Sequence, residues 1–168
     1  MNIDQSCGIT LSLATSAESP LLKNLLELYE YDFSEFTGSD VGADGTYQYQ
    51  YLNEYWIEPN RFVYIAFVRG KIAGFVMVNT HFIDNVLRWS IAEFFVLRKY
   101  RRQGIGEYMA KYAFNQHPGQ WVIMQIGSNL AAIKFWRKVV TRYTGGKYDE
   151  CEGTGDGQAG VMQLFNNG

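Results

Sequence analysis

The chain has 168 residues with a net charge of −2, and 47% of its residues are hydrophobic. This composition excludes global disorder, and the length is that of one domain with a sizeable core. The absence of a basic excess argues against a nucleic-acid partner. Aromatic residues reach 16%, which favours an aromatic pocket or a buried interface. We therefore expect a single domain over residues 1–168 that binds no nucleic acid.

Export and membrane signals are not evident in the sequence. Residues 1–16 lack the basic segment and following apolar stretch that mark a secretory signal. The longest charge-free apolar stretch lies within residues 71–84 and is too short for a membrane helix, which needs about 20 residues. We expect a cytoplasmic protein with no membrane partner.

The cysteines and histidines do not form a metal-ligand pattern. Cys7 and Cys151 lie far apart, and a reducing cytoplasm disfavours a disulfide between them. His81 and His117 have no cysteine or carboxylate companions at metal-ligand spacing. We predict no metal site.

The first half of the chain predicts a strand, a helix and a three-stranded meander. Residues 9–13 form the first expected strand, and Pro20 opens a helix whose apolar face is Leu22, Leu25, Leu26 and Tyr29. Residues 37–46 are rich in Gly, Ser and Asp and predict a loop, whereas residues 47–56 are ambiguous. Three strands then follow, antiparallel to one another, at residues 61–68, 71–78 and 86–97.

The second half predicts a change of period. Helix spacing begins at Ile105 and stops at His117-Pro118-Gly119, and a strand follows at residues 121–126. We expect Ser128 to cap a second helix, with a buried stripe of Ala132, Phe135, Trp136, Val139 and Val140. Residues 143–148 and 161–165 are expected to close the sheet, joined by the glycine-rich residues 153–160. The predicted fold class is α/β: a mixed, mostly antiparallel sheet with a central βαβ unit.

The segment with the clearest chemical meaning is the basic loop at residues 98–106. It joins an apolar strand to a helix, and Gly104 and Gly106 open that helix. The first amides of a helix lack internal partners and attract anions, and glycine lets a phosphate approach the backbone. The alternative is an ordinary solvated turn. A dinucleotide fingerprint is excluded because it needs glycine at position 109, and a P-loop is excluded because Glu107-Tyr108 follows Gly106.

Two motifs resemble the GNAT superfamily of N-acetyltransferases. Arg101-Arg102-Gln103-Gly104-Ile105-Gly106 is similar to the family's R/Q-x-x-G-x-G/A motif, in the same strand-to-helix context. Downstream, Asn129, Ala132, Phe135-Trp136 and Lys138 resemble its N-x-x-A-x-x-F-Y-x-K pattern. The resemblance implies the GNAT-like acyl-CoA N-acyltransferase fold.

The resemblance also implies acetyl-CoA as the acyl donor and suggests which residues hold it. The amides of Arg102, Gln103, Gly104, Ile105, Gly106 and Glu107 would cradle the pyrophosphate. Arg101 would order the loop or contact phosphate, and Phe94, Phe95 and Val96 would offer a strand edge to the pantetheine amides. Asn129 would contact the pantetheine arm, and Trp136 would lie beside the donor.

The transfer of an acetyl group to an amine needs a neutral nitrogen. An alkyl ammonium with a pKa near 10.4 is only about 0.04% neutral at pH 7, so a base is useful. Glu93 is the candidate, since it precedes the motif on the strand and shares a face with Phe95. A solvated strand residue or an ion-pair partner is the alternative reading of Glu93.

The resemblance also implies a tyrosine that protonates the leaving thiolate, and at the matching position this sequence has Trp136. Indole N–H donates a hydrogen bond without giving up its proton. Tyr143 is a candidate substitute, and an ordinary aromatic role is its alternative.

The acceptor pocket is expected on the first helix. Tyr29, Asp32 and Phe33 combine aromatic rings with a carboxylate, which suits a cationic amine, although two rings in the core and a solvated aspartate explain them equally well. The leading hypothesis is an N-acetyltransferase acting on a small amine or an amino terminus. A non-catalytic acyl-CoA-binding or sensing domain, or an interaction module, remains open, and each is compatible with a homodimer.

Overall fold

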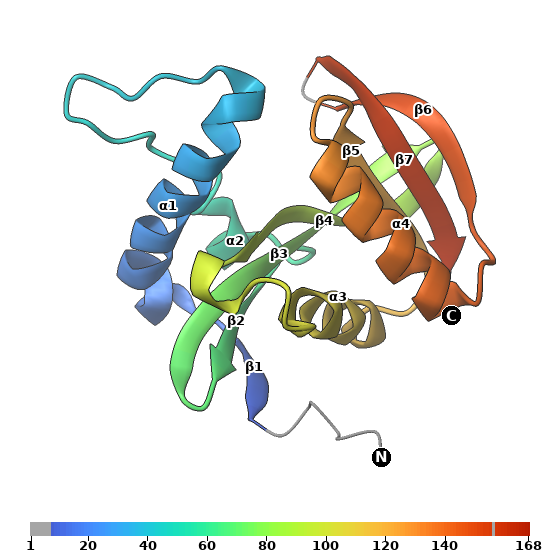
Figure 1. The fold of residues 1–168 in the computed structure, drawn as a ribbon, viewed down its shortest axis with the longest axis horizontal. Coiled ribbons are helices and arrows are strands. Elements are labelled where there is room, and N and C mark those ends of the chain that lie inside the picture. The colour runs from blue at the N-terminus through green and yellow to red at the C-terminus, as the bar shows by residue number, and fades with distance from the viewer. Residues whose placement is uncertain (1–7, 156) are drawn as a thin grey trace.

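A computed structural model describes residues 8–155 and 157–168 of the protein (Figure 1). Its seven strands are β1 (Ile9–Leu13), β2 (Phe62–Val68), β3 (Lys71–Ile83), β4 (Val86–Val96), β5 (Gln120–Ile126), β6 (Asp149–Gly155) and β7 (Gln158–Asn166). Its helices are α1 (Ser19–Thr37), α2 (Glu54–Ile57), α3 (Ile105–Gln116) and α4 (Leu130–Thr144), with short 3-10 turns η1 (Ser16–Glu18) and η2 (Arg98–Tyr100).

The strands form one mixed sheet in the order β1-β2-β3-β4-β5-β7-β6. Neighbours pair antiparallel except β4 and β5, which are parallel and are joined through α3. The predicted mixed sheet with a central βαβ unit is therefore confirmed. The β4–β5 ladder comprises only the pairs Trp89↔Trp121 and Ser90↔Val122, so the two strands diverge beyond it.

The alternation of side chains along the strands divides the core into two clusters. Val63, Ile65, Phe75 and Met77 pack with the apolar face of α1 and with Tyr55 of α2. The intervening residues Tyr64, Ala66 and Val76 pack with α3 and α4. Period-2 alternation places successive residues on opposite faces, so both faces of the central sheet are covered.

The start of α1 agrees with its sequence signals. Pro20 occupies the first turn, where a missing N–H costs nothing. Leu22, Leu25, Leu26 and Tyr29 are all buried, as predicted. The helix ends at Gly38, whose φ of 70° is left-handed and suits glycine.

The start of α4 corrects the predicted cap. Asn129, rather than Ser128, caps the helix, because its Oδ1 accepts a hydrogen bond from the amide of Ala132 at 3.0 Å. Of the predicted stripe, Trp136, Val139 and Val140 are buried, whereas Ala132 and Phe135 are half-buried.

The predicted strand at residues 143–148 is wrong. Helix α4 continues through Thr144 and ends at Gly145, with φ 65°, followed by Gly146, with φ 82°. Two consecutive left-handed glycines provide a C-cap at that point, and the next strand begins only at Asp149. The glycine-rich residues 153–160 are also not a simple linker, since Gly153 pairs with Gly160 inside the β6–β7 hairpin.

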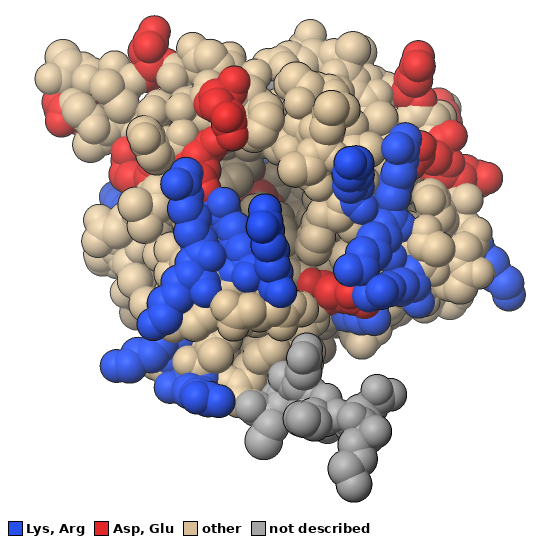
Figure 2. All heavy atoms as spheres, viewed as in Figure 1, with Lys and Arg blue, Asp and Glu red and all other residues tan. Residues whose placement is uncertain are grey.

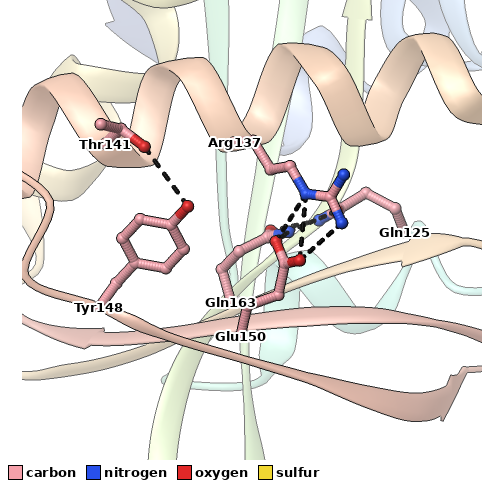
Figure 3. Close-up of polar contacts among 6 residues, drawn as sticks. All are labelled: Gln125, Arg137, Thr141, Tyr148, Glu150 and Gln163. Atoms are coloured by element: carbon pink, nitrogen blue, oxygen red, sulfur yellow. Dashed lines mark hydrogen bonds and ion pairs between the residues drawn. The ribbon is translucent and has the colours of Figure 1, made fainter.

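A polar network fastens α4 to the last three strands (Figure 3). Arg137 of α4 donates to both carboxylate oxygens of Glu150 on β6, at 2.6–3.1 Å. Gln163 of β7 is fully buried, and its amide donates to Glu150 at 3.0 Å and to Gln125 of β5 at 2.9 Å. Gln125 returns a hydrogen bond to Gln163 at 2.8 Å. Hydrogen bonds from Arg137 are the main reason that the pKa of Glu150 lies below its usual value.

Candidate active site

The divergence of β4 and β5 opens a cleft of about 1340 Å³. Residues 91–96 of β4 and 123–126 of β5 line it, together with parts of α1, α3 and α4. One edge of this β4 segment pairs with β3, and the ladder to β5 ends at Ser90↔Val122. The other edge therefore presents backbone polar groups to the cleft, which a ligand with amide groups can pair with. Phe94, Phe95 and Val96 lie on this segment, where the sequence placed them.

The basic loop reaches the same cleft. Gly104 is the N-cap of α3 and has a φ of 79°, and Arg102 has a φ of 61°. This left-handed turn points the chain into α3, whose first amides have no intrahelical partners. Figure 2 shows Lys and Arg side chains on both sides of the central hollow, over the segment between β4 and α3 and over α4. Six cationic and four carboxylate side chains line the cleft, so its charge balance favours an anionic ligand.

Glycine at position 106 is also needed for helix packing, which the sequence alone did not indicate. A Cβ added there would lie 3.2 Å from two ring carbons of Phe135 and 3.6 Å from Phe94. Glycine thus lets the first turn of α3 lie directly on the aromatic rings of α4 and β4. Glu107, in the same turn, pairs with Lys111 and Arg142, each at 2.9 Å. Partial burial raises the pKa of Glu107, but these two cations outweigh it and hold the pKa below its usual value.

Arg101 orders the loop from within the protein. Its Nε donates to the carbonyl of Val96 at 2.7 Å, and its guanidinium pairs with Asp32 of α1. Asp32 also accepts from Arg98 at 2.7 Å. Partial burial raises the pKa of Asp32, but the hydrogen bonds from Arg101 and Arg98 outweigh it and keep the pKa below its usual value. Asp32 lines the cleft, but its charge is already matched by two arginines.

Glu93 lines the cleft, where two tyrosines hold its carboxylate. The hydroxyl of Tyr29 donates to Oε2 at 2.5 Å, and that of Tyr49 donates to Oε1 at 2.9 Å. Burial, and then the negative charge of Glu93, raise the pKa of both tyrosines far above the usual range. Both phenols therefore remain protonated donors, and the carboxylate is fixed in one orientation.

Tyr49 was not identified from the sequence because it lies in the ambiguous residues 47–56. It reaches Glu93 because Glu27 of α1 accepts the backbone N–H groups of Tyr47 and Gln48, at 2.8 and 3.0 Å. Alternating tyrosines were the one available signal in this segment. The alternating tyrosines predict an aromatic surface, but they do not show that Tyr49 lies against Glu93.

The other predicted acceptor residues of α1 are brought to the cleft. Tyr29 and Phe33 both line it, and their rings stack with centroids 5.4 Å apart. Asn129 also lines the cleft, although its side-chain oxygen is used to cap α4. Trp136 lines it as a buried ring, 6% exposed, packed 4.9 Å from Phe94.

Three predicted residues are not among those that line the cleft. Tyr143 lies in the last turn of α4, where its hydroxyl donates to Asn115 at 2.8 Å and accepts from Asn167 at 3.1 Å. The side chain of Gln103 donates to the carbonyl of Lys99 at 2.8 Å. Ile105 is a core residue, 3% exposed. The structure therefore does not bring Tyr143 together with Glu93, which corrects the suggestion that it serves as the acid.

The comparisons with known proteins agree with this arrangement. The sequence model of the acetyltransferase (GNAT) family matches residues 25–140, and the chain belongs to this family. A comparison with curated protein sequences gives no match.

Solved structures share the fold at low identity. An acetyltransferase from Thermus thermophilus has a TM-score of 0.65 and 15% identity, over 95% of this chain and 97% of the other. Arabidopsis thaliana NAA60, solved with a bisubstrate analogue, has a TM-score of 0.61 and 10% identity, over 94% and 97%. An aminoglycoside acetyltransferase from an uncultured soil metagenomic sample, in complex with sisomicin, has a TM-score of 0.57 and 18% identity, over 81% and 90%.

Three further observations concern the expectations on membranes, metals and cysteines. Among the helices of the described residues, none is long and apolar enough to span a membrane. Within residues 8–155 and 157–168, no three His, Cys, Asp or Glu side chains come together as a metal site. Cys151 is a free, exposed thiol, and Cys7 lies outside the described residues.

Proposed function

We propose that this protein is an N-acetyltransferase that uses acetyl-CoA and transfers its acetyl group to a small amine or an amino terminus by direct attack in a ternary complex. The observation that carries the proposal is the position of Glu93. Its carboxylate, held by Tyr29 and Tyr49, lies in the same cleft as the open edge of β4 and the start of α3.

The cleft suits the donor in shape and charge. The first amides of α3, after the left-handed Gly104, would hold the pyrophosphate, and the cationic side chains around the hollow would add attraction. The β4 edge at residues 94–96 would pair with the pantetheine amides. Bound there, acetyl-CoA supplies a thioester that an amine can attack.

Glu93 would make the acceptor nucleophilic. An ammonium near pKa 10.4 must lose a proton before it attacks, and a fixed carboxylate within the cleft can take that proton directly or through a water. Tyr29 and Tyr49 orient the carboxylate, and their raised pKa values keep them from competing as bases.

No protein acid is proposed for the leaving group. Trp136 occupies the family's tyrosine position, and Tyr143 is engaged with Asn115 and Asn167. A thiol with a pKa of about 8.5 leaves as a tolerable thiolate, so transfer can proceed without a donor at this position.

The second candidate is a non-catalytic acyl-CoA-binding or sensing domain. The observation that favours it is Trp136 itself, since an indole cannot supply a proton. Tight acetyl-CoA binding with no transfer to any amine in a broad panel would support this candidate over the enzyme.

The test is acetyl transfer, followed as free thiol released from acetyl-CoA in the presence of a panel of amines. We expect turnover by the wild type and a loss of about 10²–10⁴-fold in kcat for Glu93→Gln, the usual contribution of a general base. Glu152→Gln changes an exposed carboxylate on β6 outside the cleft and serves as the matched control. Equal turnover by Glu93→Gln and the wild type across pH would remove Glu93 from the mechanism.

A further inference from the structure

Two buried polar side chains in the cleft wall lack partners. Asn79 of β3 and Ser90 of β4 lie directly opposite each other and are 9% and 1% exposed. Among the residues that the structure describes, neither Asn79 Oδ1 nor Ser90 Oγ has a hydrogen-bond partner. Both residues line the cleft. Buried polar atoms are nearly always hydrogen-bonded, so an unpartnered pair facing a cleft points to a ligand group.

The pair lies on the same face of the sheet as Glu93. Met77 pairs with Glu93, and Asn79 pairs with Ser90, two residues further along β3; a β-bulge between the two pairs makes the separation three residues along β4. Met77 belongs to the cluster packed under α1, so Asn79 faces that side too. Two residues of strand span about 7 Å. Measured along β3, the polar pair is thus about 7 Å from Glu93, on the side where β4 meets β5.

The cleft wall around Glu93, Asn79 and Ser90 is aromatic rather than acidic. Tyr29 and Tyr49 line the cleft at Glu93, and the ring of Phe33 stacks on Tyr29. His81, two residues beyond Asn79 on β3, also lines the cleft. Asp32 is already paired with two arginines, and cationic side chains outnumber carboxylates in the lining. This wall suits one cationic nitrogen on an apolar body and disfavours an acceptor with several positive charges.

We propose that Asn79 and Ser90 form a second polar contact for the acceptor, which is a monoamine with an apolar, ring-sized body and a hydrogen-bond donor about 7 Å from the reacting nitrogen. Such a donor is a hydroxyl or an amide N–H. Asn79 Oδ1 accepts its hydrogen, and Ser90 Oγ can accept or donate beside it. This inference rests on the proposed function, because it assigns Glu93 to the reacting nitrogen.

The test compares two amines that differ by one hydroxyl, phenethylamine and tyramine, in the thiol-release assay. We expect wild-type kcat/KM to favour tyramine by about tenfold, the effect of one hydrogen bond worth about 1.4 kcal/mol. Asn79→Leu, which keeps the volume and removes the polar group, should bring the ratio of the two kcat/KM values close to one. Ser90→Ala should reduce the ratio in the same direction.

Thr80→Val is the matched control, since Thr80 neighbours Asn79 on β3 but is not among the residues lining the cleft. It should keep the wild-type ratio. Thermal unfolding of Asn79→Leu provides a second readout: a polar group that waits for a ligand can be replaced without a lower melting temperature.

The outcomes separate the two proposals. If the wild type acetylates other amines of the panel but neither of these two, or if Asn79→Leu keeps the tyramine preference, the inference about Asn79 is overturned and the proposed function stands. A large drop in the melting temperature of Asn79→Leu would also overturn it, because the side chain would then be structural. If acetyl-CoA does not bind at all, the proposed function fails and this inference fails with it.

Discussion

The buried His117 makes the stability of the fold depend on pH. Its ring is 6% exposed and lies between Phe62 and Trp89, with centroids 4.6 and 4.5 Å away. Its Nε2 is 2.8 Å from the hydroxyl of Tyr64. Burial lowers the pKa of His117 from 6.5 to about 4.

The sign follows from which state binds the proton. Between pH 6.5 and pH 4 an unfolded chain carries a protonated His117, whereas the folded chain keeps it neutral. Acid therefore favours unfolding over that range, and the stabilisation is lost as pH falls below 6.5. Each pKa unit corresponds to about 1.36 kcal/mol, so the loss between pH 7 and pH 5 is about 2 kcal/mol.

Urea unfolding at pH 7 and pH 5 measures this loss. The wild type should lose about 2 kcal/mol more than His117→Gln, which removes the titrating ring. Tyr64→Phe should be less stable at both pH values by about 1 kcal/mol yet keep the wild-type slope, because burial rather than the hydrogen bond lowers the pKa. An identical pH dependence in the wild type and His117→Gln would refute the reasoning.

Three further predictions concern the frame around the cleft. Gln163→Leu should lower the free energy of unfolding, measured by urea titration, by about 2–3 kcal/mol, because it leaves Gln125 and Glu150 without a buried partner. An unchanged free energy of unfolding would show that the network does not stabilise the fold. Gly104→Val forces a β-branched residue to a φ of 79° and should raise the acetyl-CoA Kd at least about tenfold while circular dichroism stays native; wild-type affinity would contradict the pyrophosphate assignment. Gly106→Ala should lower the free energy of unfolding by about 1–3 kcal/mol, because the added methyl group contacts the ring of Phe135. Adding Phe135→Leu to the same chain should recover part of this loss. If the double variant instead loses the sum of the two single-variant losses, that contact is not the cause.

The sequence predicted those features that depend on neighbours along the chain. Pro20 and the leucine spacing gave the start and buried face of α1. Strand alternation correctly separated Glu93 and Phe95 from Phe94, which packs with the α3–α4 cluster. The strand, basic loop and glycines at residues 94–106 were sufficient to indicate the family.

Contacts between segments that are distant in sequence could not be predicted from neighbouring residues along the chain. Tyr49 approaches Glu93 only because the chain folds back over α1, 44 positions away in sequence. Asn79 and Ser90 become a buried pair only through the β3–β4 register. Asp32 looked like an open carboxylate, because its arginine partners are more than 60 positions distant.

The two wrong secondary-structure predictions, the cap of α4 and the strand at residues 143–148, arose where neighbouring residues favour more than one structure. Ser128 and Asn129 are both good capping residues, and the geometry of the turn after β5 selects Asn129. Aromatic Tyr143 and Tyr148 resemble strand residues, but Gly145 and Gly146 end a helix between them. That helix carries Tyr143 into contact with Asn115 and Asn167, away from the lining of the cleft.

The central claim is that the cleft between β4 and β5 binds acetyl-CoA, and calorimetric titration of the purified chain tests it most directly. Adenosine 3′,5′-bisphosphate and NADH serve as comparators that share parts of the nucleotide without the thioester arm. The account predicts micromolar acetyl-CoA binding with negligible NADH binding. Absence of acetyl-CoA binding, or equal affinity for NADH, would contradict it.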